Sequence, residues 1–168
     1  MSQARPEVWM RGPVSGYEAL LQPVVHAFLQ VREELEALAP KVPQGQLFAT
    51  PGGAASIAFH VRHIGGATDR LLTYARGEAL TAEQFATLKA EGLDNGEPIE
   101  AMLAGTMAQI GRALEQVRRT GLDDLLTERK VGRAGHPTTT LGLLFHAAEH
   151  ATRHSGQALT TAKILTGS

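Results

Sequence analysis

The chain has 168 residues, of which 43% are hydrophobic and 20% are charged, a composition typical of a folded globular protein rather than a disordered or membrane protein. Its formal net charge is -1, with acidic and basic residues interspersed, so no basic stripe is available to neutralise a nucleic-acid backbone. The absence of cysteine excludes disulfides, thiolate metal ligands and a cysteine nucleophile, so any metal ion must be held by nitrogen and oxygen.

The length fits one domain preceded by a short N-terminal arm. Residues 1–14 contain two prolines and a glycine and are expected to be extended, with Trp9 burying its ring to pin the arm to the body. Residues 15–168 are expected to form a single helical domain. No segment approaches the roughly 20 apolar residues needed to cross a bilayer, so we expect no membrane partner and a cytoplasmic location.

Helical periodicity begins at Ser15 and predicts a first long helix that runs to about Leu38. Ser15 can cap this helix, and Glu18 three residues later completes a capping box. Pro23 lies inside the span, so a kink there or a later helix start is an alternative.

A second long helix is predicted over residues 56–77, where apolar residues recur at helical spacing and Gly77 ends the pattern. Gly65 and Gly66 stand in its interior, where each glycine costs roughly 1 kcal/mol against alanine. The pair indicates close approach of another backbone or of a ligand, and fold-neutral drift is the alternative.

A short helix and a third long helix are predicted next. Thr81 with Gln84 is a capping start for a helix that ends near Lys89, and a loop over 92–98 follows it. Apolar positions then recur over 99–117 and predict the third long helix, closed by the glycine at position 121.

Residues 122–137 are polar and are expected to form a mobile loop, before a last long helix over 139–165. No alternating pattern is long enough to build a sheet. Four long helices with unequal connections predict an all-α fold, a four-helix bundle with a short extra helix in the crossover between helices 2 and 3.

Five of the seven histidines fall in two of the predicted helices. Those in the second helix are His60 and His63, and those in the last helix are His146, His150 and His154. Residues four apart lie on one helix face about 6 Å apart along the axis, so two such imidazoles can bind one ion. His146 and His154 are separated by about 12 Å, too far for all three to bind the same ion. A further ligand must come from another helix, and periodicity leaves both His60 and His63 open.

The segments SIAFHVRHIGGATDRLL and HAAEHATRHSGQAL resemble the two signature regions of the DinB/YfiT-like superfamily of metal-dependent enzymes. The order and spacing of the elements are similar over nearly the whole chain. The resemblance implies a DinB-like four-helix bundle in which one histidine of helix 2 and an HxxxH pair of helix 4 hold the metal. Carried onto this sequence, the ligands are His63, His150 and His154.

The same resemblance makes His60, His146 and Gln157 candidates for groups beside the ligands. One departure from the family pattern is visible. Ser155 follows His154 where the family often has arginine, which puts an anion contact from that position in doubt.

Three neutral imidazoles leave positions on the ion open to water or substrate. Zinc or nickel suits this ligand set better than manganese, because the set contains no carboxylate. Such an ion can lower the pKa of bound water, polarise a carbonyl or bind a thiol as thiolate. Glu149 and His60 are weak candidates for catalytic groups; Glu149 points about 100° around the helix from His150, so a solvated role is its alternative. His26 and His136 are expected outside the site.

The resemblance implies a metal-dependent transferase or hydrolase acting on a small molecule. The implied reactions are thiol S-transfer with a low-molecular-weight thiol such as bacillithiol or mycothiol as cosubstrate, a related isomerisation, and hydrolysis. The resemblance also implies a homodimer. Two alternatives remain: a structural or sensor metal site closed by a fourth ligand such as His60, and a helical interaction protein whose histidines are coincidental.

Overall fold

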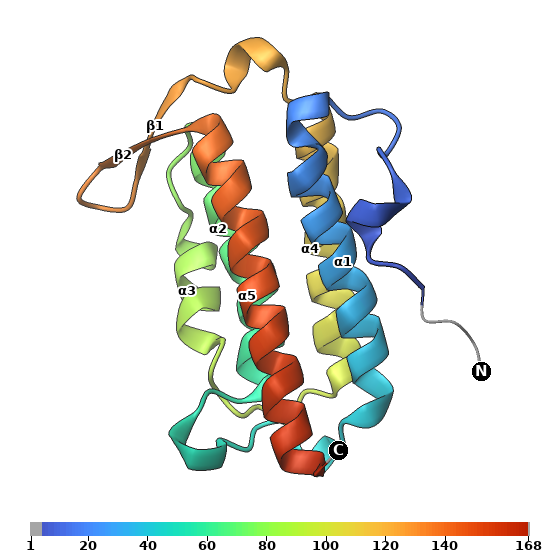
Figure 1. Ribbon diagram of the computed structural model, residues 1–168. Helices are drawn as coiled ribbons and strands as arrows, with labels where there is room; N and C mark the ends of the chain where they lie inside the picture. Colours follow the sequence, from blue (N-terminus) through green and yellow to red (C-terminus); the bar gives the residue numbers. More distant parts are fainter. Residues whose placement is uncertain (1–4, 168) are drawn as a thin grey trace.

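The computed structural model describes residues 5–167, which form a bundle of long helices with one short helix and one small hairpin (Figure 1). The long helices are α1 (Gln22–Leu38), α2 (Ile57–Ala75), α4 (Ile99–Arg119) and α5 (Thr140–Thr166), and the short helix is α3 (Ala82–Ala90). This arrangement confirms the predicted all-α class and the extra helix in the crossover between the second and third long helices. Among the described residues, no helix is long and apolar enough to span a bilayer.

The seam between α2 and α5 is the most extensive helix contact in the bundle, and α1 and α4 complete it (Figure 1). The helix α3 lies against α2, on its outer side. The two segments that carry the clustered histidines are therefore neighbours along their length.

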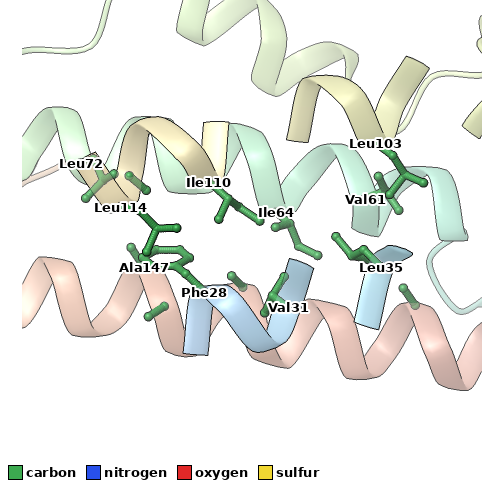
Figure 2. Packing of buried hydrophobic residues seen from close by; sticks show 14 of the residues in the cluster. Phe28, Val31, Leu35, Val61, Ile64, Leu72, Leu103, Ile110, Leu114 and Ala147 are labelled. Carbon is green, nitrogen blue, oxygen red and sulfur yellow. The ribbon is translucent and has the colours of Figure 1, made fainter. Parts of the chain in front are cut away.

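The hydrophobic core fills the space between the four long helices. Figure 2 shows Phe28 of α1, Ile64 of α2 and Ile110 of α4 meeting there, and all three are fully buried. Half of the buried residues of α5 are alanines: Ala147, Ala148, Ala151, Ala158 and Ala162. Because a close-packed interior leaves no voids, these small side chains let α5 lie close to its neighbours. That closeness brings the α5 histidines within reach of α2.

The helix α2 begins and ends much as its sequence predicts. The side chain of Ser56 caps it by accepting a hydrogen bond from the Phe59 N–H at 3.1 Å. In its interior, a Cβ at Gly65 would lie 3.3 Å from the Thr106 Cα of α4. The Thr106 hydroxyl also donates to the carbonyl of Val61 at 2.8 Å. Gly65 is thus required by close approach of another backbone, one of the two reasons offered for the glycine pair.

The helix α1 begins at Gln22, so the predicted capping box at Ser15 is wrong. Gly16 has φ 84°, which is incompatible with a right-handed helix, and a short 3-10 turn at Ala19–Leu21 precedes α1. Pro23 occupies the first turn of α1, where its missing N–H breaks no helical hydrogen bond. The later helix start is the alternative that the structure supports.

The N-terminal segment is held by residues other than Trp9. The Trp9 side chain is 62% exposed and donates its indole N–H to Glu7 at 2.7 Å, so its predicted burial is wrong. Instead Val8 is buried, and Arg11 donates to both carboxylate oxygens of Glu33 in α1, at 2.6 and 2.7 Å. A forked guanidinium–carboxylate pair of this kind fixes orientation as well as distance. Residues 1–4 of the expected arm lie outside the described residues.

The segment predicted as a plain mobile loop contains a β-hairpin. Strand β1 (Glu128–Val131) pairs antiparallel with β2 (His136–Thr139), so the expectation that no segment builds a sheet is wrong here. Each strand has four residues, too few to show a clear alternation of polar and apolar side chains. The Arg129 side chain donates to the carbonyl of Ala75 at 2.7 Å, which ties the hairpin to the end of α2.

Candidate metal centre

Three histidines converge at the seam between α2 and α5. The Nε2 atoms of His63 and His150 are 2.9 Å apart. The ring centroid of His154 lies 4.5 Å from that of His63 and 4.5 Å from that of His150. One ring nitrogen from each residue lies within 4.8 Å of the other two, a grouping that could hold a metal ion. The structure thus brings together the three residues that the family resemblance names as ligands.

Helix geometry explains this convergence. His150 and His154 are one turn apart on α5 and therefore project from the same face. His63 projects from the facing side of α2, since its Nε2 lies 2.9 Å from that of His150. Ala147 and Ala151 of α5 are buried. Bundle cores are common places for metal sites because side chains of facing helices meet there.

Burial keeps the imidazoles of α5 neutral. Loss of solvation, with a smaller contribution from the neighbouring His63, lowers the pKa of His150 to about 4 and that of His154 to about 4. The same two causes lower the pKa of His60. A neutral imidazole has a free lone pair, which is the form that binds a metal. The cluster therefore needs no proton release on α5 near pH 7.

The donor set fits a divalent ion of the zinc or nickel kind, which prefers imidazole nitrogen. His63 donates its Nδ1–H to a carboxylate, so its Nε2 lone pair faces His150. The Nδ1 atom of His150 is buried and has no hydrogen-bond partner within residues 5–167. The polar neighbour of that ring is the Nε2 of His63, which faces His150 Nε2. Two imidazole nitrogens this close to each other favour a proton or a cation between them.

Glu91 is the carboxylate that faces His63, and sequence reasoning missed it. Its oxygens lie 2.6 Å from His63 Nδ1 and 2.7 Å from Arg70 Nη1, and the residue is 2% exposed. Burial by itself opposes ionisation of Glu91, but the hydrogen bonds from His63 and Arg70 outweigh it and hold its pKa below the usual value. The only sequence signal for this contact is the second glycine of the pair, Gly66, which lies directly against the carboxylate.

Phe59 is a second residue that the sequence reasoning did not single out. Its ring stacks on that of His63, with centroids 5.0 Å apart and planes 15° apart, and also contacts His60 and His154 edge-on. It covers one side of the cluster with apolar surface, which strengthens electrostatic interactions beneath it.

The candidates for neighbouring groups fall in different places. His60 is 4% exposed, and its Nδ1 lies 2.9 Å from the Nδ1 of His154. It therefore contacts one histidine of the cluster without being one of the three that converge. The ring of His146 lies 5.5 Å from that of His150, and its side chain is half-exposed. Gln157 lies on the exposed face of α5 and forms no hydrogen bond to the cluster among the described residues.

Two further positions on α5 do not contribute to the cluster directly. Glu149 pairs with Arg153, and the hydrogen bond from Arg153 holds the pKa of Glu149 below its usual value. Ser155 is fully buried and donates to Glu34 of α1 at 2.6 Å. Position 155 therefore faces α1, and the doubt about an anion contact from it does not affect the cluster.

The two remaining histidines lie outside the site, as expected. His26 Nε2 is 3.1 Å from the carbonyl oxygen of Gly12, and His136 is exposed on β2.

The lowered pKa values of His150 and His154 make the stability of the metal-free protein depend on pH. Each pKa falls from the ordinary histidine value of 6.5 to about 4 in the folded chain, so the unfolded state binds more protons between these values. Stability is then fully present above about pH 6.5 and is lost as the pH falls toward 4. We expect the free energy of unfolding of metal-free protein, measured in urea, to be lower at about pH 5 than at about pH 7.

A matched variant isolates this effect. Changing His150 and His154 together to glutamine should reduce the pH dependence in that window to the part that His60 contributes, because carboxylates with lowered pKa values titrate at lower pH. An equal slope in the double variant and the wild type would contradict the assignment.

The fold and the cluster together define a four-helix bundle with a candidate three-histidine metal site. The sequence model of the DinB superfamily matches residues 27–158, which include all five clustered histidines. The chain belongs to the DinB superfamily. No curated protein sequence matches it.

Proposed function

We propose that the protein is a metal-dependent enzyme that binds one divalent ion, zinc or nickel, through His63, His150 and His154. The observation that supports this is the convergence of one ring nitrogen from each residue within 4.8 Å. Neutral imidazoles suit zinc and nickel, whereas manganese prefers oxygen ligands. Membership of the DinB superfamily is compatible with such a centre.

Three protein ligands are typical of a catalytic site, because a structural zinc site is usually closed by four. When bound, such an ion supplies Lewis acidity, which activates water, polarises a carbonyl or stabilises a thiolate. The residues of this chain shape access to it. Phe59 covers one side, while the half-exposed His146 borders the cluster next to His150, so a small molecule can approach from there.

Among the implied reactions, thiol S-transfer with a low-molecular-weight thiol fits the site better than hydrolysis. Hydrolysis at a metal centre usually employs a free general base. In the described part of the chain, both carboxylates next to the cluster are engaged, Glu91 with His63 and Arg70, and Glu149 with Arg153. In thiol transfer the nucleophile comes from the cosubstrate, so no free carboxylate is required.

The test is an activity comparison on protein loaded with zinc or nickel. Small thiols are offered with an electrophilic acceptor, and esters and amides are offered separately for hydrolysis. We expect thiol-dependent turnover that is lost in His150→Ala and unchanged in His136→Ala. Turnover of esters or amides without thiol would favour the hydrolase. Metal binding without any turnover would leave a non-catalytic metal-binding protein.

The expected homodimer remains a prediction. Size-exclusion chromatography with light scattering measures the mass of the assembly directly.

A further inference from the structure

We propose that Glu91 is a positioning residue of the metal centre, which presents the Nε2 lone pair of His63 to the ion and is itself held by Arg70. This inference depends on the proposed function, since it assigns His63 as a ligand. It adds to the centre a residue that lies outside the two histidine-containing segments.

The contacts of Glu91 are specific and buried. The residue follows the last turn of α3, and its two carboxylate oxygens have separate partners. Oε2 lies 2.6 Å from His63 Nδ1, and Oε1 lies 2.7 Å from Arg70 Nη1. Arg70 is 8% exposed, so both charges are largely removed from water. Burying two charges is costly unless each is paired and hydrogen-bonded, and this arrangement meets that condition.

The glycine at position 66 of α2 leaves room for the carboxylate of Glu91. A Cβ at position 66 would collide with Glu91 Oε1 and would lie 2.8 Å from Arg70 Nη1. Glycine inside a helix costs roughly 1 kcal/mol relative to alanine. Gly65 faces the backbone of α4, whereas the atoms nearest to a Cβ at position 66 belong to the side chains of Glu91 and Arg70. Glycine at position 66 therefore leaves the space that the buried carboxylate occupies beside α2.

The contact determines which nitrogen of His63 can bind a metal. Because the carboxylate accepts a hydrogen bond from Nδ1–H, the lone pair is on Nε2, the atom 2.9 Å from His150 Nε2. Metal-binding histidines commonly donate their second N–H to a carboxylate, which fixes the ring and raises its basicity.

The other two rings lack such a partner. His154 faces the neutral ring of His60, and His150 Nδ1 has no partner within residues 5–167. Among the described residues, His63 is therefore the one ligand whose ring is oriented by a carboxylate.

The experiment compares zinc affinity, measured by competition with a chelator, in Glu91→Gln and Glu97→Gln. Glu97 is a matched control because it also pairs with an arginine of α2, Arg62, at 2.8 Å, but does not touch the cluster. We expect Glu91→Gln to weaken zinc binding by about 10–100-fold, the usual effect of losing an outer partner of a ligand. Glu97→Gln should leave the affinity unchanged.

A second variant tests the same contact with the carboxylate intact, and so covers the case in which Glu91→Gln does not fold. Gly66→Ala should displace the carboxylate and weaken zinc binding, with no further loss when combined with Glu91→Gln, since the two changes act on one contact. In metal-free wild-type protein, nitrogen-15 NMR of the imidazoles should show His63 protonated on Nδ1.

The outcomes separate the two proposals. Wild-type affinity in both Glu91→Gln and Gly66→Ala, or a His63 proton on Nε2, overturns the role of Glu91 and leaves the metal centre in place. A wild-type protein that takes up no zinc overturns the proposed function and the role of Glu91 with it.

Discussion

Replacing His154 with alanine is expected to abolish stoichiometric binding of zinc or nickel. His154 lies at the centre of the cluster, with its ring 4.5 Å from those of both His63 and His150. Its loss leaves two imidazoles, too few to hold an ion tightly when water competes for the remaining positions. The loss of metal affinity should be larger than the loss of about 10–100-fold expected when a residue that hydrogen-bonds to a ligand is removed. Competition with a chelator measures it.

Two other histidine variants serve as controls for this result. His26→Ala and His136→Ala remove imidazoles outside the cluster and should retain metal at wild-type affinity. His150→Ala should behave like His154→Ala. If His154→Ala still bound one ion tightly while His60→Ala did not, His60 would be the ligand and the cluster as described would be wrong.

Replacing Phe28 with alanine is expected to lower the free energy of unfolding by about 3–5 kcal/mol. Phe28 is fully buried and lies among side chains of the other long helices (Figure 2). Its removal leaves a cavity that the rigid packing of four helices closes only in part. Urea unfolding followed by circular dichroism measures the loss, and each 1 kcal/mol should lower Tm by about 2–4 °C in a chain of this size.

Phe145 provides the matched comparison, because it is the same residue type with 58% exposure. Phe145→Ala should change the stability by no more than about 0.5 kcal/mol, as is usual at the surface. A loss at Phe28 no larger than that at Phe145 would show that the bundle packs differently from the structure described.

Most of the helical framework could be predicted from local sequence. The helices α2, α3 and α5 begin at residues whose side chains cap them: Ser56, Thr81 and Thr139. Capping and periodicity act over a few residues and are therefore visible in sequence. The predicted start of α1 was wrong because Ser15 and Glu18 have the spacing of a capping box, whereas Gly16 adopts a positive φ that a right-handed helix cannot contain.

The remaining fold errors have a common cause. The strands β1 and β2 are too short to leave a periodic signal, and the hairpin contacts the end of α2 through Arg129. Trp9 is exposed because Val8 and Arg11 hold the segment instead. Such contacts join distant parts of the chain and leave no local pattern.

The site shows the same division. Four-residue spacing indicated His150 and His154 together, but periodicity left His60 and His63 open, because both lie near the same face of α2. The choice depends on how α2 is rotated against α5, which the structure shows: His63 faces His150, and His60 faces the outer nitrogen of His154. Glu91 lies 28 residues from His63, and only Gly66 hinted at a close neighbour.

The most direct test of the metal centre is elemental analysis of the protein purified without a histidine tag, side by side with His63→Ala. The structure predicts one zinc or nickel ion per chain in the wild type and none in the variant, which keeps only the two histidines of α5. A wild-type protein that contains no metal and takes up none when it is added would contradict the account and leave a helical bundle whose histidines have no metal-binding role.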